Sequence, residues 1–216
     1  MSDNRRFEWK PGQRGSDVAI YCYEDEHGSV LFRKVKTETG DPQHPKTFRC
    51  ERLIDGRWTT KQRILDGIRK VPYRLPKIMS SPAVIVAEGE KDADNLAELG
   101  FSATCCHCGA GEWPVEITPF FTGKAVYILY DVDTRCRANH PGMVAANLYG
   151  TTKRIYIIDL EPHFLPAEKL ADIHEKDVSD YLLNFADRKN KITAVQNLLR
   201  EAQIYKPPRI TTDGPR

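Results

Sequence analysis

Beyond Pro82 the sequence alternates short apolar runs with segments of helical periodicity. The spacing of apolar residues predicts a helix over 90–99 that stops at Gly100. Runs this short, separated by helices, are typical of parallel strands that are buried on both faces. We therefore expect an α/β fold with a mostly parallel sheet flanked by helices. The predicted strands are 83–87, 101–104, 125–130 and 154–158, and further helices are predicted over 141–152 and 192–203.

Before Pro82 the pattern is that of β-strands and turns. The segments "VAIYCYED" and "SVLFRKVKTE" flank Glu26-His27-Gly28, which predicts a hairpin. A second turn is predicted at Asp55-Gly56, and three prolines block long helices in the connector 62–81. The predicted domains are a flexible N-terminal segment 1–16, a basic β-containing lobe 17–81, an α/β domain 82–185, a C-terminal helix 186–205 and a flexible tail 206–216.

Basic residues are concentrated between residues 46 and 77. This stretch holds ten Lys and Arg against three acidic residues, although the whole chain carries a net charge of only +2. A local excess of positive charge suits a phosphate backbone. A solvated basic face with no partner is the alternative.

The composition is that of a globular protein that does not enter a membrane. Hydrophobic residues make up 40% of the chain and charged residues 29%. No run approaches the roughly 18 apolar residues that span a bilayer. The first residues, "MSDNRRFEWKPGQRG", lack the apolar stretch of a secretion signal, so we expect a cytoplasmic location.

The cysteines do not have the spacing of a disulfide framework or of a typical zinc site. A cytoplasmic chain argues against disulfides. Cys105, Cys106 and Cys108 surround His107, but four consecutive ligands cannot easily point at one tetrahedral ion. We expect a tight loop after a strand, and whether these four residues bind a metal is left open.

Acidic residues stand where two of the predicted strands end. Glu88 follows the run 83–87, and Asp131 and Asp133 follow the run 125–130. Sites in open parallel sheets form at the carboxyl edge of the strands, and residues i and i+2 of a strand face the same side. If the two strands are neighbours, the three carboxylates meet at one rim.

Clustered carboxylates repel one another, and some would take up protons unless a cation neutralised them. A later segment, "KDVSD", adds Asp177 and Asp180 to the acids. Oxygen donors without His or Cys suit a hard ion, Mg²⁺ or Mn²⁺, rather than zinc. Because such ions bind substrate phosphates, the pattern indicates phosphoryl chemistry. Each acid taken alone is equally consistent with a strand-end residue that faces water.

The stretches "VIVAEGEKDADNLAELG", "YILYDVD" and "KDVSDYL", in this order, resemble the Toprim domain. Bacterial-type primases, type IA and II topoisomerases and some nucleases share that domain. The resemblance implies a Toprim-like Rossmannoid sheet, with residues 82–185 as the catalytic domain. The forms "EGEKDAD" and "KDVSDYL" are most similar to those of phage and plasmid primases, which implies a phage or plasmid protein acting in a bacterial cell.

The implied activity is that of a DNA primase, a DNA-directed RNA polymerase that makes short primers on single-stranded DNA from nucleoside triphosphates. Glu88 would act near the nucleophile, while Asp131 and Asp133 would hold Mg²⁺ or Mn²⁺ against the incoming triphosphate. The implied metal ligands are Glu88, Asp131, Asp133 and Asp177.

Two further acids support this set in the family pattern. Asp92 lies four residues after Glu88, where bacterial primases carry an aspartate. The second acid of the late segment falls on Ser179 here, with Asp180 adjacent, so this chain departs from the pattern at that ligand.

The resemblance reaches upstream, where lobe 17–81 is similar to the basic lobe that guides the template in phage-type primases. Tyr73 or Trp58 would be available for base stacking. Both could equally be core residues, and for Trp58 we expect a core position. The predicted nucleic-acid-binding residues are Arg69, Lys70, Tyr73, Arg74 and Lys91.

Two departures and three rival functions follow. The separated Cys/His pairs of the primase zinc-binding domain do not occur, nor does a Gly-x-x-x-x-Gly-Lys-Ser/Thr loop of a helicase. We therefore expect a helicase or a zinc-binding partner to be supplied separately.

A metal-dependent Toprim nuclease and a non-catalytic replication or nucleic-acid-binding module are the alternatives. A topoisomerase is disfavoured, because it needs a nucleophilic tyrosine on large additional domains.

Overall fold

The computed structural model describes residues 15–132, 134–164 and 176–208. The chain divides into two compact units. One comprises the chain up to Tyr23 together with Val30–Ile68, and the other comprises Glu24–Ser29 together with the chain from Arg69 onward. Each unit has its own sheet and is described by itself.

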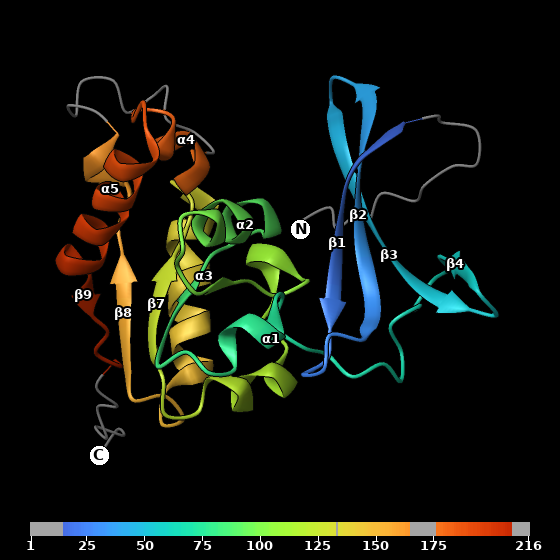
Figure 1. Cartoon of the computed structure of the whole chain (residues 1–216), viewed down its shortest axis with the longest axis horizontal. Helices are drawn as coiled ribbons and strands as arrows, with labels where there is room; N and C mark the ends of the chain where they lie inside the picture. Colours follow the sequence, from blue (N-terminus) through green and yellow to red (C-terminus); the bar gives the residue numbers. More distant parts are fainter. Residues whose placement is uncertain (1–14, 133, 165–175, 209–216) are drawn as a thin grey trace, which may run out of the picture. The chain divides into compact units, whose positions relative to one another are not determined.

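The first unit is built on a four-stranded sheet in the order β1-β2-β3-β4. Its strands are β1 (Ser16–Glu24), β2 (Val30–Asp41), β3 (His44–Ile54) and the short β4 (Arg57–Thr59). β3 runs antiparallel to both β2 and β4. Figure 1 shows the three long strands as blue ribbons, with β4 following β3.

Both predicted turns join strands of this sheet. Between β1 and β2, the Asp25 carboxylate accepts hydrogen bonds from the backbone N–H groups of His27 and Ser29, each at 2.9 Å. Between β3 and β4, Asp55 and Gly56 have φ angles of 49° and 73°. Two consecutive left-handed residues form the type of tight turn that matches the twist of a hairpin.

The second unit contains a five-stranded sheet in the order β6-β5-β7-β8-β9. β5 pairs in parallel with β6 and β7, and β7 pairs in parallel with β8, whereas β9 is antiparallel to β8. The predicted mostly parallel sheet is therefore confirmed. The strands are β5 (Ala83–Val86), β6 (Ala103–Thr104), β7 (Ala125–Leu129), β8 (Arg154–Ile158) and β9 (Gln203–Ile204).

Helices pack against this sheet through buried apolar side chains. α2 contacts β6, α3 contacts β7 and β8, and α5 contacts β8, which is seen for α5 beside β8 in Figure 1. The α-helices are α1 (Leu75–Ile78), α2 (Glu90–Glu98), α3 (Thr134–Leu148), α4 (Val178–Leu182) and α5 (Arg188–Glu201). Short 3₁₀ segments cover Gly109–Gly111, Val115–Phe121 and Glu161–His163.

Two helix starts differ from the sequence predictions. α2 ends as expected, because Gly100 adopts φ 99° just beyond its last turn. The helix predicted over 141–152 was expected to start at Pro141, because proline is favoured in the first turn of a helix. α3 instead begins at Thr134 and carries Pro141 in its interior. α5 begins at Arg188, four residues early, because the Asp187 carboxylate caps it by accepting from the backbone N–H of Asn190 at 2.8 Å.

None of the helices in the described ranges combines the length and apolar character needed to cross a membrane.

Candidate functional site

The acids Glu88 and Asp131 lie at the carboxyl edge of two adjacent strands. β5 and β7 are paired in parallel, with Val86 opposite Ile128. If this register is carried past the strand ends, Glu88 falls level with Tyr130, one residue before Asp131. Both acids are half-buried. The chain therefore brings the two strand-end acids to one rim of the sheet.

Asp131 stands close enough to three other acids for their charges to act on it. Burial, followed by the charges of Glu88, Asp92 and Asp177, raises the pKa of Asp131 from 3.8 to about 8. Acids from three separate segments, at residues 88–92, 131 and 177, thus form one electrostatic group, which we call the acidic edge: Glu88, Asp92, Asp131 and Asp177.

Asp92 lies in the first turn of α2 with only 5% of its surface exposed. Ser179 donates its hydroxyl to Asp92 Oδ1 at 2.5 Å, and Asn95 donates its side-chain amide to the Ser179 oxygen at 2.6 Å. Burial and then the charge of Asp177 raise the pKa of Asp92 to about 6, against the opposing effect of the Ser179 hydrogen bond. Ser179 therefore orients a buried carboxylate at the position where the family pattern expects an acid.

Asp177 is held beside the end of β7 by the backbone. The backbone N–H of Val132 donates to the carbonyl of Lys176 at 2.8 Å, which fixes the residue before Asp177 next to the residue after Asp131. Asp177 is also the N-cap of α4, with its Oδ1 accepting from the Asp180 backbone N–H at 2.8 Å.

The Asp180 carboxylate makes the reciprocal half of this capping box. Its Oδ2 accepts from the backbone N–H of Asp177 at 3.3 Å. In the described contacts, Asp180 thus stabilises the start of α4. The supporting role of Asp180 in the acidic set stays a prediction beside this capping role, and its charge also acts on Lys91.

Lys91 makes a direct ion pair with the acidic edge. Its Nζ lies 2.5 Å from Asp177 Oδ2, and half of its side chain is exposed. Partial burial of Lys91 disfavours its charge, but the hydrogen bond to Asp177 and the charges of Asp177, Asp92 and Asp180 outweigh this effect and raise its pKa.

Asp133, the second acid of the "DVD" motif, lies outside the described residues. Among the residues that are described, no group of three or more His, Cys, Asp or Glu side chains is arranged to hold a metal ion. The chemistry of the donor set nevertheless fits Mg²⁺ or Mn²⁺. The donors are carboxylate oxygens, and a divalent cation would relieve the burial and repulsion that raise the pKa of Asp131.

The cysteine-rich loop follows β6 at the same edge of the sheet. Cys105 and Cys106 are buried, and the Cys106 thiol lies 3.4 Å from the carbonyl of Glu112. Cys108 Sγ lies 3.4 Å from His107 Nε2. All four residues of this loop are described, and their side chains do not form a metal-binding group.

The two faces of the four-stranded sheet carry different charge patterns. Arg33 faces Glu51 across β2 and β3, and Arg49 faces Val35 on the same side. Ion pairs at 2.6–2.8 Å link Arg33 to Glu51, Glu51 to Arg49 and Arg49 to Asp17. Because these pairs satisfy the arginines internally, the positive charge on this face is largely neutralised.

The other face carries lysines and an exposed aromatic ring. Lys36 lies opposite Phe48, and Lys34 Nζ lies 4.9 Å from the centre of the Phe48 ring. Phe48 is 48% exposed and Lys46 is exposed, whereas Lys34 is only 9% exposed. Side chains two residues apart on a strand share a face, and Glu38, which lies opposite Lys46, is on this face too. We call the basic and aromatic members of this set the basic face: Lys34, Lys36, Lys46 and Phe48.

Of the two aromatic residues considered for base stacking, Tyr73 is buried and Trp58 is exposed. Tyr73 is 7% exposed and donates its hydroxyl to Asp94 Oδ2 at 3.0 Å. Its ring has little surface for a base, so the prediction that Tyr73 stacks on nucleic acid is not supported. Trp58, expected in the core, is 36% exposed and lies under the Arg33 guanidinium at 4.1 Å.

Two of the predicted phosphate-binding residues of the connector, Arg69 and Arg74, form contacts with other side chains of this protein. Arg74 pairs with Asp94 at 2.7 Å. Arg69 donates to Glu26 at 2.9 Å and lies over the Phe120 ring at 5.2 Å. Both side chains keep surface exposure, and Lys70 is half-buried. Contacts of Arg69, Lys70 and Arg74 with nucleic acid remain predictions.

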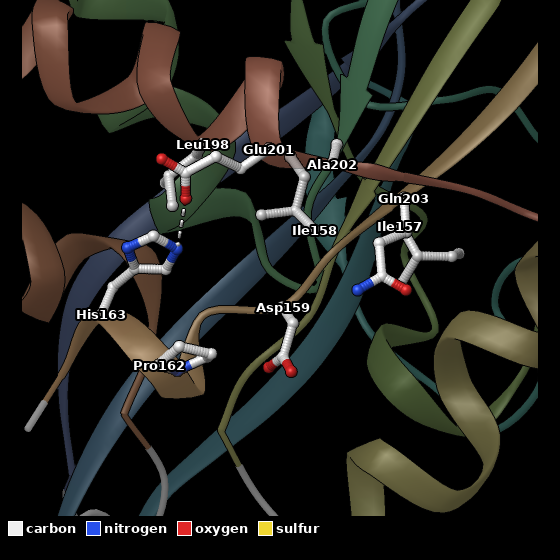
Figure 2. A pocket seen from close by; sticks show the side chains of 9 residues that line it. All are labelled: Ile157, Ile158, Asp159, Pro162, His163, Leu198, Glu201, Ala202 and Gln203. Atoms are coloured by element: carbon white, nitrogen blue, oxygen red, sulfur yellow. Dashed lines mark ion pairs between the residues drawn. The ribbon is translucent and has the colours of Figure 1, made fainter. Parts of the chain in front are cut away.

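A separate cavity of about 190 Å³ lies where β8 ends against the last turn of α5 (Figure 2). His163 and Glu201 point toward each other there, with 3.4 Å between their Nε2 and Oε2 atoms, and Asp159 lies nearby. No residue of the acidic edge lines this cavity. It is therefore distinct from the candidate site.

The sequence patterns missed Ser179, Asn95 and Phe48. Ser179 follows Asp177 by two residues, so its place in the motif was a signal, but its hydrogen bond to Asp92 crosses to another helix. Phe48 lies among basic residues, and only the pairing of β2 with β3 shows which of them share its face.

Comparison with solved structures finds a similar fold in a bacterial primase. The crystal structure of the Aquifex aeolicus primase, comprising zinc-binding and RNA polymerase domains, matches 86% of this chain with a TM-score of 0.57 and 18% identity. This chain spans 40% of the length of that chain. No family model and no curated protein matches the sequence. The fold of this chain is therefore primase-like.

Proposed function

We propose that this protein is a primase-type nucleotidyltransferase that makes short primers on single-stranded DNA. The observation that carries the proposal is the acidic edge. Glu88 and Asp131 follow two paired parallel strands, and the charges of Asp92 from α2 and Asp177 at the start of α4 also act on Asp131. The primase-like fold supports it. Residues 82–185 would then act as a Toprim-type catalytic domain.

The acidic edge would bind Mg²⁺ or Mn²⁺ through Glu88, Asp131 and Asp177, with Asp133 in the set that the Toprim resemblance implies. When bound, such an ion neutralises phosphate charge and aligns the triphosphate for attack by a ribose hydroxyl. Asp92, oriented by Ser179, keeps a further negative charge beside this group. Glu88 lies at the strand end next to Asp131, where it can accept a proton from the attacking hydroxyl.

The basic face would bind the template strand. Lys36 and Lys46 supply charge for phosphates, and the exposed ring of Phe48 supplies a stacking surface that any base can use. The opposite face offers less net charge, because its arginines pair with Asp17 and Glu51. We therefore assign the template to the side that carries Lys36 and Lys46.

We propose a helicase or a zinc-binding template-recognition factor as a partner of this protein, as the resemblance to primases implies. The primase structure with the similar fold includes a zinc-binding domain.

Primer synthesis by purified protein tests the proposal. The full chain is incubated with single-stranded DNA, labelled ribonucleotides and Mg²⁺ or Mn²⁺, and short labelled products are resolved on a gel. Asp131→Ala should abolish synthesis. Asp159→Ala is the matched control, because it removes an exposed acid of the same sheet outside the acidic edge. Equal activity of wild type and Asp131→Ala would refute the proposal.

Labelled single-stranded and duplex substrates in the same reactions separate the rival functions. Cleavage that disappears in Asp131→Ala, without primer synthesis, would identify a nuclease. Template binding that survives Asp131→Ala, with neither activity in the wild type, would identify a non-catalytic module.

A further inference from the structure

Lys91 forms an ion pair with an acid of the acidic edge, a contact that phosphate binding alone does not require. It is the second residue of α2, and its side chain bridges from that helix to Asp177 at the start of α4. Asp92 and Asp180 are the other charged groups that act on it strongly. The Lys91 ammonium group therefore lies beside the acidic edge, where its positive charge offsets the negative charge of the carboxylates.

The two carboxylate oxygens of Asp177 have different hydrogen-bond partners. Oδ1 accepts the backbone N–H of Asp180 at 2.8 Å, in a cap that is fixed by the fold of α4. Oδ2 accepts Lys91 Nζ at 2.5 Å. The lysine side chain is half exposed and has a flexible four-carbon stem, so it can swing away into solvent. Oδ2 is thus the oxygen that an incoming cation can take, and Lys91 is the group that would leave.

We propose that Lys91 is a tethered counter-ion of the acidic edge, which neutralises Asp177 when no divalent cation is bound and competes with that cation for Asp177 Oδ2. This inference rests on the proposed function, because it assumes that the acidic edge binds a divalent ion. It replaces the predicted contact of Lys91 with phosphate as the resting role of this residue.

The direction of the effect follows from charge. Lys91 adds one positive charge within hydrogen-bonding distance of a ligand oxygen, so it repels a divalent ion and must be displaced from its partner. Removal of Lys91 should therefore tighten divalent-ion binding by about tenfold, which corresponds to about 1.4 kcal/mol. The ion-free protein should become less stable, because Asp177 then lacks its counter-charge.

The test compares Mn²⁺ binding by three full-length proteins: wild type, Lys91→Met and Lys189→Met. Lys189 is the matched control, since it is an exposed lysine at the second position of another helix, α5. Titration calorimetry should give a Kd for Lys91→Met about tenfold below the other two. Mn²⁺ should also raise the melting temperature of Lys91→Met more than that of wild type.

A double-mutant cycle with Asp177→Asn locates the competition. In the Asp177→Asn background, Lys91→Met should tighten Mn²⁺ binding by much less than in the wild-type background, because the lysine no longer has an Oδ2 charge to compete for. Lys91→Gln, which removes the charge but keeps a polar end group, provides a second variant if Lys91→Met does not fold.

An unchanged or weaker Mn²⁺ affinity in both Lys91 variants would overturn the inference while leaving the proposed function in place, provided that Asp131→Ala still abolishes primer synthesis. Absence of Mn²⁺ binding by the wild-type protein would overturn both.

Discussion

The raised pKa of Asp131 makes the stability of the ion-free protein depend on pH. With a pKa of about 8 in the folded state against an ordinary 3.8, Asp131 holds its proton in the folded protein at pH values where the unfolded chain has lost it. Folding therefore binds a proton between about pH 4 and pH 8. Stability is greatest at the acid end of this window and falls as the pH rises through it.

The substitution Asp131→Asn removes this titration with little change in side-chain size. Each pH unit in the window costs the wild-type protein up to about 1.4 kcal/mol, so the cost accumulated by pH 7 has a ceiling of about 4 kcal/mol. Asp131 is half-buried, and solvent and local relaxation reduce this figure. We expect Asp131→Asn to be about 2 kcal/mol more stable than wild type at pH 7 and nearly equal to it at pH 4.

Thermal unfolding in EDTA at pH 4.5, 6, 7 and 8 measures this difference. For a chain of this size, 2 kcal/mol corresponds to about 4–8 °C in the melting temperature. Asp159→Asn serves as the control for loss of one acidic charge outside the acidic edge. The reasoning fails if the advantage of Asp131→Asn is the same at every pH, or if it is largest at the acid end.

Three further predictions concern the same residues and the basic face. Mn²⁺ at saturating concentration should flatten the pH dependence of wild-type stability but not that of Asp131→Asn, as measured by the same melting curves; an equal response in both would contradict a role for Asp131 in ion binding. Ser179→Ala should raise the pKa of Asp92 above about 6, because it removes the hydrogen bond that lowers this pKa. The pH–rate profile of primer synthesis should then move to higher pH. An unmoved profile would show that ionised Asp92 is not required. Lys36→Gln and Lys46→Gln should each weaken single-stranded DNA binding and reduce the slope of log K against log salt by about 0.7, in fluorescence anisotropy titrations, whereas Lys189→Gln should leave the slope unchanged.

The two strand-end acids of the acidic edge were predictable from the sequence. Glu88 and Asp131 each come directly after an apolar run, and parallel pairing of β5 with β7 places both run ends at one rim. Asp177 was singled out as an acid of the "KDVSD" segment, but strand periodicity did not place it beside them. The backbone hydrogen bond from Val132 to Lys176 brings Asp177 to β7. It joins residues 44 positions apart, so no local sequence pattern predicts it.

The roles of Ser179 and Asp180 could not be read from the motif. In "KDVSD" the acid at Asp180 looks like a replacement for the ligand lost at Ser179. Asp180 is the third residue of α4, and its carboxylate turns back to accept from the Asp177 backbone N–H. Ser179 is left to face α2, where it meets Asp92. A one-residue offset thus separates a capping side chain from one that supports the site.

The charge of residues 46–77 shows why a local count overstates a binding surface. Arg49, Arg63, Arg69 and Arg74 form ion pairs with acids, and three of these acids lie outside the stretch: Asp17, Glu26 and Asp94. The planar guanidinium favours such bidentate internal pairs, whereas the lysine ammonium is more strongly hydrated and stays at the surface. Lys46, Lys61 and Lys77 are exposed. Salt-dependent DNA binding by this chain should therefore respond more to its lysines than to these four arginines.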